Sequence, residues 1–394
     1  MIKTHKIKLY PNATMKRHLD QLFNYHRYCW NLALETWNTL YELHLIDKEN
    51  NKKPNEYAVR NELVAHKEDW QYGLSARVLQ QSVASLSKAW KNFFNPQMPH
   101  HDRPKFKSKK LSKKSFTTDR AKIKNGKLML DKPRGINVLW YGIKMAESPR
   151  FEGQIKMATV VEEADGLYAC LSIDTNDNEL SQGKDVAGVD VNIGHFNYND
   201  GKTISTLPDH LIKLYERITH YQRLLARKRV SNPNQFRSTN YRKVRTKLKR
   251  SYQRIARIQE DLLKKFVHQL STDFHTICIE DLDVNRMKMN KRLAKNIHRS
   301  MFRKFRDMIQ YKSEWMGNRF VVADRYYPST QRCSHCNHVK TGKDKMTLQG
   351  DTIYHEHHTY RCYECGTVMN RDENAVNNLI HYAVGLTTEG AQST

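Results

Sequence analysis

The sequence lacks long hydrophobic runs, and none approaches the roughly 18 residues that a membrane-spanning helix needs. Residues 1–6 alternate in polarity and lack the apolar centre of a signal peptide. Cysteine is also scarce, with 7 thiols in 394 residues, whereas a secreted disulfide framework is denser and occurs in shorter chains. We therefore expect no membrane partner, and a cytoplasmic protein whose thiols stay reduced.

Acidic residues are few relative to basic ones. The chain has 67 Lys and Arg against 41 Asp and Glu, which is a formal net charge of +26. Self-repulsion on this scale destabilises an isolated compact state, so a large polyanion is the expected partner. A hydrophobic content of 39% indicates a folded protein, and the length allows about two or three domains. The composition therefore predicts a protein that binds nucleic acid.

The first half of the chain has the pattern of strands around a helical insertion. Alternation over residues 2–10 predicts a strand. Apolar residues then recur at helical spacing from Leu19 to Tyr41 and again after Gly73, and we interpret both aromatic stripes as core. Residues 122–173 contain short alternating segments separated by turn residues, which predict a small antiparallel barrel or sheet.

A basic segment without acids, residues 103–114, lies between these parts. Such a run is usually a solvated loop. Phe106 lies within it and Phe116 follows it, so a segment that tracks phosphates and stacks rings on bases is an equal alternative. Lys105 and Lys107 are its candidate nucleic-acid contacts.

The second half of the chain has a different sequence pattern from the first half. Residues 186–191, 276–279 and 319–322 are apolar and predict buried strands. Residues 207–270 predict two long, very basic helices with a break near residues 231–234. Their apolar positions leave the Arg and Lys side chains on the opposite face, which suits binding to phosphates.

Four of the thiols form two C-x-x-C pairs, Cys333 with Cys336 and Cys362 with Cys365. Thiolate pairs at this spacing can each bind one side of a tetrahedral Zn²⁺ ion. Ligation by four Cys closes the coordination sphere, so this zinc should be structural. The simplest alternative for this feature alone is a plain zinc ribbon on a basic, ribosome-associated protein.

Three carboxylates indicate a catalytic site. Asp190 lies in one apolar strand, Glu280 ends another, and Asp372 opens a helix. A single acid in such a place is commonly a cap or a turn residue. Brought together, three carboxylates could hold two Mg²⁺ ions about 3.5–4 Å apart for in-line attack on a phosphodiester. Together with the positive charge, they predict a nuclease.

These residues resemble those of the transposon-encoded OrfB or TnpB proteins, a family of RNA-guided DNA nucleases related to the type V CRISPR effectors. The resemblance covers nearly the whole chain, and the order and spacing of its C-terminal segments are specific. It is carried by residues 79–81, 90–94, 104–107, 188–190, 279–282 with Met287, 327–330, 333–336, 362–366 and 371–375.

The resemblance implies a multidomain α/β protein. Its nuclease domain would be ribonuclease H-like (RuvC) with an inserted zinc ribbon, and an N-terminal β-barrel wedge domain would be interrupted by a helical recognition lobe. The expected parts are a wedge strand (1–12), the recognition lobe (13–95), the wedge barrel (96–183), the RuvC-like domain (184–332 and 366–384), a target nucleic-acid-binding zinc ribbon (333–365) and a disordered tail (385–394).

The resemblance also implies an activity. The chain would bind a guide RNA transcribed from the transposon end, read a short transposon-adjacent motif, and cleave target double-stranded DNA. Asp190, Glu280 and Asp372 would be its catalytic residues and would hold two Mg²⁺ ions, alongside one structural Zn²⁺. We expect a monomer that works on the nucleoid of a prokaryotic cell.

Further nucleic-acid contacts follow from this expectation. Gln80 and Gln81 are candidates for reading the DNA motif, because an amide side chain can pair bidentately with adenine. Ordinary polar positions on a core helix explain them equally well. Arg245 and Arg254 belong to the basic helices, which we expect to line a channel for an RNA–DNA duplex.

Three asparagines depart from the family pattern. Asn192 and Asn337 stand where glycine is frequent, and Asn370 replaces an acid that is common before Arg371. None of these changes removes a member of the carboxylate triad.

Other functions remain open at this point. The chain could be a catalytically silent repressor directed to DNA by guide RNA, or a compact type V CRISPR effector. A zinc-ribbon RNA-binding protein without catalysis is the third class. The intact triad disfavours the silent repressor, since such a protein has no need to keep all three acids.

Overall fold

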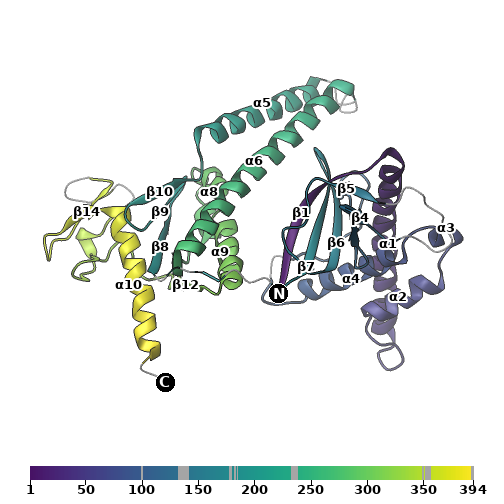
Figure 1. Cartoon of the computed structure of the whole chain (residues 1–394), viewed down its shortest axis with the longest axis horizontal. Helices are drawn as coiled ribbons and strands as arrows, with labels where there is room; N and C mark the ends of the chain where they lie inside the picture. Colours follow the sequence, from purple (N-terminus) through teal and green to yellow (C-terminus); the bar gives the residue numbers. More distant parts are fainter. Residues whose placement is uncertain are drawn as a thin grey trace. The chain divides into compact units, whose positions relative to one another are not determined.

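The computed structural model describes residues 1–98, 101–131, 142–176, 180–181, 183, 185–231, 238–347, 350 and 356–391. The chain divides into two compact units, Met1–Asp177 and Asn178–Thr394. This division falls close to the predicted boundary at residues 183–184. Each unit has its own sheet and its own core (Figure 1).

Unit 1 contains a seven-stranded antiparallel sheet in the order β2-β6-β7-β1-β5-β4-β3. Its strands are β1 (Ile2–Tyr10), β2 (Ser115–Thr118), β3 (Lys122–Lys124), β4 (Lys127–Met129), β5 (Ile143–Met145), β6 (Gln154–Glu163) and β7 (Gly166–Asp174). Among the described residues nothing pairs β2 with β3, so the antiparallel sheet is confirmed and the closed barrel is not.

Four helices are inserted between the first two strands of this sheet. They are α1 (Ala13–Ile46), α2 (Glu56–Ala65), α3 (Asp69–Tyr72) and α4 (Ala76–Phe93). The side chains of Asn12 and Ser75 cap α1 and α4. The two aromatic stripes form core as predicted, and Trp37 of α1 stacks on Trp90 of α4 with ring centroids 5.9 Å apart. The ends of these stripes differ from the prediction, because Tyr41 of α1, Phe93 of α4 and Phe94 after α4 are exposed.

Unit 2 is built on a five-stranded sheet in the order β10-β9-β8-β11-β12. The strands are β8 (Asp185–Val191), β9 (His195–Tyr198), β10 (Lys202–Ser205), β11 (Phe274–Glu280) and β12 (Arg319–Ala323). β8, β11 and β12 are parallel, and β9 and β10 add antiparallel strands at one side. The three apolar runs are therefore the three parallel strands.

Helices cover both faces of this sheet (Figure 1). The helices of unit 2 are α5 (Asp209–Ser231), α6 (Thr239–Asp273), α7 (Val284–Lys288), α8 (Ala294–Ser300), α9 (Phe302–Met316) and α10 (Arg371–Ala391). α6 and α9 pack on the face that carries Ala187 and Val189, whereas α10 packs on the face that carries Cys278. α10 continues to Ala391, so the tail expected from residue 385 begins as helix, and residues 392–394 lie outside the described residues.

α5 and α6 are the two long basic helices that the sequence predicts. Figure 1 shows them as a hairpin that extends beyond the sheet. Leu211, Leu214 and Ile218 of α5 pack against Ile255 of α6, which leaves the basic side chains outside. In the described part of the chain, no helix combines the length and the apolar character needed to cross a membrane.

Candidate functional site

The first two predicted carboxylates lie on adjacent parallel strands. Ile279 of β11 pairs with Val189 of β8, so Glu280 lies beside Asp190 at the ends of their strands. Side chains alternate along a strand, and Cys278 of β11 packs toward α10. Glu280 therefore shares the face of the sheet that α10 covers, and Asp190 shares it in β8.

Gly188 allows α10 to approach this face. A Cβ atom on Gly188 would lie 2.3 Å from the carbonyl oxygen of Val376 in α10. No side chain fits such a contact, so glycine is required for close backbone approach. The Gly188-Val189-Asp190 segment thus combines a contact surface for the helix with a carboxylate two residues later.

Asp372 is the second residue of α10, which brings it to the same place. Asn370 caps this helix: its Oδ1 accepts hydrogen bonds from the backbone N–H of Asp372 at 2.8 Å and of Glu373 at 3.3 Å. The positive end of the helix dipole favours a carboxylate there. The departure at Asn370 therefore leaves a side-chain oxygen at the capping position.

Two residues of the β9 strand contact Asp372. Asn197, the cross-strand partner of Asp190, donates from Nδ2 to Asp372 Oδ2 at 2.9 Å. Nε2 of His195 lies 3.8 Å from the same oxygen. Sequence reasoning missed both residues, although a polar Asn between Phe196 and Tyr198 in a buried strand was a usable signal.

The carboxylates are close enough for their charges to affect one another. Burial raises the pKa of Asp190 well above its ordinary value, and the nearby charges of Glu280 and Asp372 raise it further. Burial also raises the pKa of Glu280. Like charges held together in a site with little water attract a cation, so the site is suited to binding one.

Hydrogen-bond donors hold Asp190 and Glu280. Nδ2 of Asn192 donates to Asp190 Oδ2 at 2.7 Å, and the hydroxyl of Ser329 donates to Glu280 Oε1. Asn192 thus replaces a frequent glycine with a donor. Ser329 comes from the Tyr327-Pro328-Ser329-Thr330 segment, which the sequence singled out only as a point of resemblance.

The carboxylates fit a hard divalent cation through the chemistry of their donors, since all are oxygens. The four thiol sulfurs all lie within 4.8 Å of one another. Among the described residues, the oxygens of the three carboxylates do not form such a group. The fold thus gathers Asp190, Glu280 and Asp372 at one edge of the sheet, and the assignment of Mg²⁺ to them stays a prediction.

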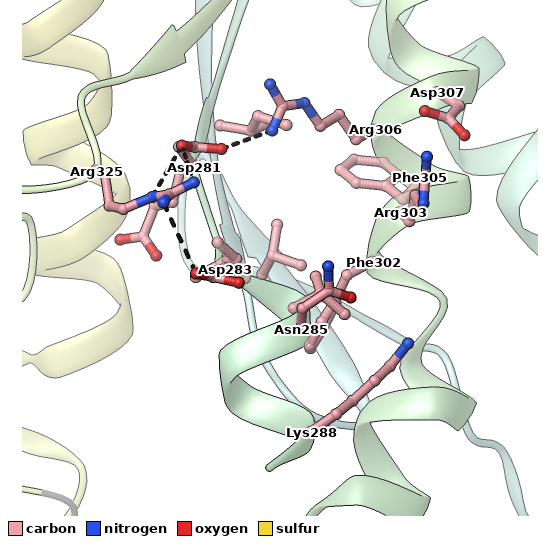
Figure 2. A pocket seen from close by; sticks show the side chains of 15 residues that line it. Asp281, Asp283, Asn285, Lys288, Phe302, Arg303, Phe305, Arg306, Asp307 and Arg325 are labelled. Carbon is pink, nitrogen blue, oxygen red and sulfur yellow. Dashed lines mark hydrogen bonds and ion pairs between the residues drawn. The ribbon is translucent and has the colours of Figure 1, made fainter. Parts of the chain in front are cut away.

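A cavity of about 390 Å³ opens next to Glu280 between the end of β11, α7 and α9 (Figure 2). Asp281 is the centre of an ion-pair network on its wall, 2.6 Å from Arg306 and 2.8 Å from Arg325. Burial raises the pKa of Asp281, but the hydrogen bonds and charges of these arginines outweigh it and hold the pKa below its ordinary value. Asp281 is therefore a structural anion, unlike its neighbour Glu280.

The four predicted zinc ligands lie together. The Sγ atoms of Cys333 and Cys365 are 3.8 Å apart, and those of Cys336 and Cys362 are 3.6 Å apart. A tetrahedral ion with Zn–S bonds of about 2.3 Å requires S–S separations of about 3.8 Å. The quartet therefore fits a tetrahedral metal ion without rearrangement.

The ribbon around these thiols has a short two-stranded sheet, β13 (Thr359–Arg361) with β14 (Val368–Asn370), and a 3₁₀ turn at Gly342–Asp344. Asn337 has a φ of 63°, and Gly366 has a φ of 72° at the corresponding place in the second knuckle. Asparagine is among the few non-glycine residues that accept this left-handed conformation. The departure at Asn337 therefore preserves the knuckle.

Side chains of α10 fasten the ribbon to the carboxylate site. Asn374 accepts from the backbone N–H of Ser334 at 2.9 Å, and Asn378 donates to the carbonyl of Ser329 at 2.8 Å. The backbone N–H of Arg371 donates to the carbonyl of His358 at 2.8 Å. The helix that carries Asp372 thus also holds both the metal ribbon and the segment that positions Glu280.

The candidate nucleic-acid contacts lie in different surroundings. Gln80 and Gln81 are half-buried on α4, and Oε1 of Gln80 accepts a hydrogen bond from Arg77 at 2.8 Å. Arg245 and Arg254 are exposed on α6. All four stay predictions.

The two candidate lysines of the basic segment differ from each other. Lys105 is exposed and pairs with Asp102 at 2.8 Å. The Lys107 ammonium lies 3.6 Å from the ring centroid of Trp30 and 3.1 Å from Nε2 of His26. Lys107 therefore anchors the segment, and a phosphate contact would require its side chain to leave these partners.

Comparison with known families matches three separate parts of the chain. The family described as "Probable transposase" (OrfB) matches residues 168–291, and the helix-turn-helix domain of the same OrfB group matches residues 1–45. In the structure, residues 1–45 form β1 and most of the single long helix α1. The Cas12f1-like TNB domain matches residues 302–379, which include the thiol ribbon.

Two relatives match over nearly the full length of the chain, and a third matches about half of it. A Streptomyces pristinaespiralis protein named as a candidate RNA-guided DNA endonuclease is 27% identical over 98% of this chain and 89% of its own. InsQ of Escherichia coli, named in the same way, is 23% identical over 96% of this chain and 92% of its own. TnpB-like protein L79 of Acanthamoeba polyphaga mimivirus is 25% identical over 51% of this chain and 38% of its own.

One solved structure, of a Cas12f1–sgRNA–target DNA complex, aligns with 96% of this chain and 98% of its own at 14% identity and a TM-score of 0.49. The family matches and relatives together define a class of transposon-associated proteins. The chain is similar to the OrfB (TnpB) family in these parts and along its length, as its sequence resemblance predicts.

Proposed function

We propose that this chain is an RNA-guided DNA endonuclease that hydrolyses phosphodiester bonds with divalent cations. The observation that carries the proposal is the gathering of Asp190, Glu280 and Asp372 where α10 begins over the ends of β8 and β11. The names of its relatives in Streptomyces and Escherichia support the same activity.

We infer that unit 2 is a ribonuclease H-like (RuvC) domain. Its sheet has three consecutive antiparallel strands, β8 to β10, followed by two parallel strands that are each reached through helices. This order supports the assignment of β8, β11 and α10 as the elements that carry the catalytic acids. Unit 1 would then provide the wedge and the recognition lobe.

Asp190, Glu280 and Asp372 would hold Mg²⁺ through their oxygens. When bound, the metal supplies a Lewis acid that makes water a stronger nucleophile and stabilises the leaving oxygen. The chain's own residues orient the acids: Asn192 holds Asp190, Ser329 holds Glu280, and Asn197 holds Asp372. α10 excludes water from the strand ends that it covers.

The four thiols would hold one Zn²⁺ with a structural role. Four sulfur ligands leave no position for a substrate. Because α10 contacts the ribbon through Asn374 and Arg371, this zinc would stabilise the helix end that carries Asp372.

The partners would be a guide RNA and double-stranded target DNA. The exposed cations of α5 and α6, Arg245 and Arg254 among them, would contact phosphates of the paired strands. Guide pairing would supply target specificity. The nucleoid of a prokaryotic cell would be the place of action.

The test compares cleavage with binding. The RNA that copurifies with the chain is sequenced to define the guide, and a plasmid with the matching target is incubated with the complex and Mg²⁺. We expect Asp190→Ala and Asp372→Ala to slow cleavage more than roughly 100-fold, with guide and target binding unchanged. Asp200→Ala, at an exposed turn between β9 and β10, is the matched control and should cut normally.

Three outcomes would change the assignment. Normal cutting by Asp190→Ala or Asp372→Ala would show that the site is wrong. Guide-directed binding by the wild-type chain without cutting would favour the silent repressor. Failure of the wild-type chain to bind either RNA or DNA would reject the proposed function.

A further inference from the structure

The sequence offered two aromatic rings near the basic segment as candidates for stacking, and the structure separates them. Phe116 is buried in unit 1, 5.5 Å from Phe23 between ring centroids. Phe106 is 61% exposed. Phe116 therefore belongs to the core, and the interpretation of it as a stacking ring is wrong.

The backbone on both sides of Phe106 is fixed to α1. Trp30 donates from Nε1 to the carbonyl of Lys105 at 3.1 Å. Asn31 contacts Lys107 twice: its Nδ2 donates to the Lys107 carbonyl at 3.0 Å, and its Oδ1 accepts from the Lys107 N–H at 2.7 Å. Two adjacent helix residues thus satisfy the peptide groups that flank the ring.

The side chain of Lys107 adds a further anchor to α1. Its ammonium donates to Nε2 of His26, and Nδ1 of His26 lies 2.7 Å from the hydroxyl of Ser82. That hydroxyl itself donates to the carbonyl of Val78 at 2.6 Å, so His26 must donate from Nδ1 and accept at Nε2. Burial keeps His26 neutral by lowering its pKa to about 3, which matches this chain of bonds.

The anchoring leaves Phe106 as an exposed ring on a backbone with little freedom. Exposing an apolar ring forgoes burial free energy, whereas immobilising it in advance reduces the entropy that a ligand must supply on binding. The same segment carries the exposed cations Lys105, which pairs with Asp102, Lys109 and Lys110. A flat apolar face among positive charges is complementary to a nucleobase whose phosphates are near.

We propose that Phe106 stacks on an unpaired nucleobase of the bound nucleic acid. The proposal rests on the proposed function and assigns a contact within it. A base inside a duplex has both faces covered by its neighbours, so the partner must be an unpaired base or the last base of a duplex. Guide RNA and target DNA can both supply such a base, and the chemistry of the contact is the same.

Binding measurements with matched variants test the stacking. Phe106→Ala and Phe106→Leu should weaken binding of one nucleic acid by roughly 5- to 150-fold, since a stacked base contributes on that scale. Phe106→Tyr and Phe106→Trp should bind as the wild-type chain does. Leu111→Ala removes an exposed apolar side chain, 88% exposed, from the same region and should have no effect. Because the ring is exposed, all variants should melt as the wild-type chain does.

Photo-crosslinking identifies the strand. Complexes are prepared with 5-iodouridine in the guide RNA or 5-iododeoxyuridine in the target DNA, and the crosslinked residue is found by mass spectrometry. A crosslink at Phe106 from one of the two strands supports the proposal and names the source of the base.

Several results would overturn it. Normal binding by Phe106→Leu, with no crosslink at this position from either strand, would reject the stacking and leave the proposed function intact. A change in sedimentation of Phe106→Leu without any change in nucleic-acid binding would show that the ring contacts protein instead. Wild-type binding to neither nucleic acid would reject the proposed function itself.

Discussion

Asp190 is a buried carboxylate that lies near two further carboxylates, those of Glu280 and Asp372. Burying a negative charge in this way costs free energy, and repulsion from Glu280 and Asp372 adds to the cost. We expect this loss of stability because the residue forms part of a cation site.

The first prediction concerns this cost. Asp190→Asn keeps the size and the acceptor for Asn192 but removes the charge. In buffer without divalent cations at pH 8, we expect the variant to be more stable to unfolding by roughly 1–3 kcal/mol, while its cleavage in Mg²⁺ is lost. Thermal melts read the stability, with Asp200→Asn as the exposed control. A wild-type chain at least as stable as Asp190→Asn would contradict the argument.

The second prediction concerns Ser329, which is buried and donates to Glu280. Without its hydroxyl, the carboxylate loses a partner that fixes its orientation, a loss of about 1–3 kcal/mol. Ser329→Ala should therefore cut about 5- to 150-fold more slowly at limiting Mg²⁺, and Ser329→Thr should recover most of the rate. Guide and target binding should be unchanged in both. Equal rates for the two variants would show that the hydroxyl has no positioning role.

At the scale of elements, α10 is the part of unit 2 on which the site depends. It packs on Cys278 and the end of β12 through Leu379 and Ala383, and its first turn carries Asp372. The sequence predicts this helix start, but the closeness of the helix to β8 follows only from the contact at Gly188.

The third prediction tests this contact. Gly188→Ala would place a methyl group against the Val376 carbonyl, so α10 must move. We expect destabilisation of about 2 kcal/mol or more and loss of cleavage as Asp372 is displaced. Gly385→Ala in the same helix has open space around it and should be neutral or stabilising. Normal stability and cleavage in Gly188→Ala would contradict the packing described.

In unit 1, the basic segment is an element held by α1. Burial lowers the pKa of Lys107 to about 8, below the value of about 10.4 expected for an unfolded chain. Between these values the unfolded state binds more protons than the folded state, so stability from this group rises as the pH rises.

The fourth prediction follows from this rise in stability with pH. The stability of the wild-type chain relative to Lys107→Met should rise by up to about 3 kcal/mol between pH 8 and pH 10.5. Denaturant unfolding of both proteins at several pH values measures the difference, and Lys105→Met, at an exposed lysine of the same segment, is the control. A difference that is flat or falls with pH would contradict the buried position of the ammonium.

At the scale of the whole molecule, the net charge of +26 is the property that binding should reveal. Each phosphate contact releases condensed counterions, which makes the logarithm of the binding constant fall with the logarithm of salt concentration. A residue that contacts a phosphate changes the slope of this salt dependence. A charged residue elsewhere on the surface does not.

The fifth prediction uses this difference. Replacing Arg245 and Arg254 with Gln should reduce the salt slope for duplex binding by about 1–2. The control replaces Lys52 and Lys53, which are exposed between α1 and α2, with Gln. This control removes the same charge and should leave the salt slope unchanged. Equal slopes in the two double variants would show that α6 does not line the channel.

The sequence by itself determined the local elements and the chemistry of the ligands. Residues 2–10 alternate and form β1, each C-x-x-C pair has the spacing of a metal-binding knuckle, and the apolar runs form β8, β11 and β12. These features depend on spacing between near neighbours, which a linear pattern records.

Only the tertiary structure decided the contacts between distant segments. It buried Phe116 and exposed Phe106, joined Ser329 to Glu280 and Asn197 to Asp372, and left the sheet of unit 1 open among the described residues. Burial and hydrogen-bond partners depend on which surfaces meet in space, and no pattern within one segment specifies the other surface.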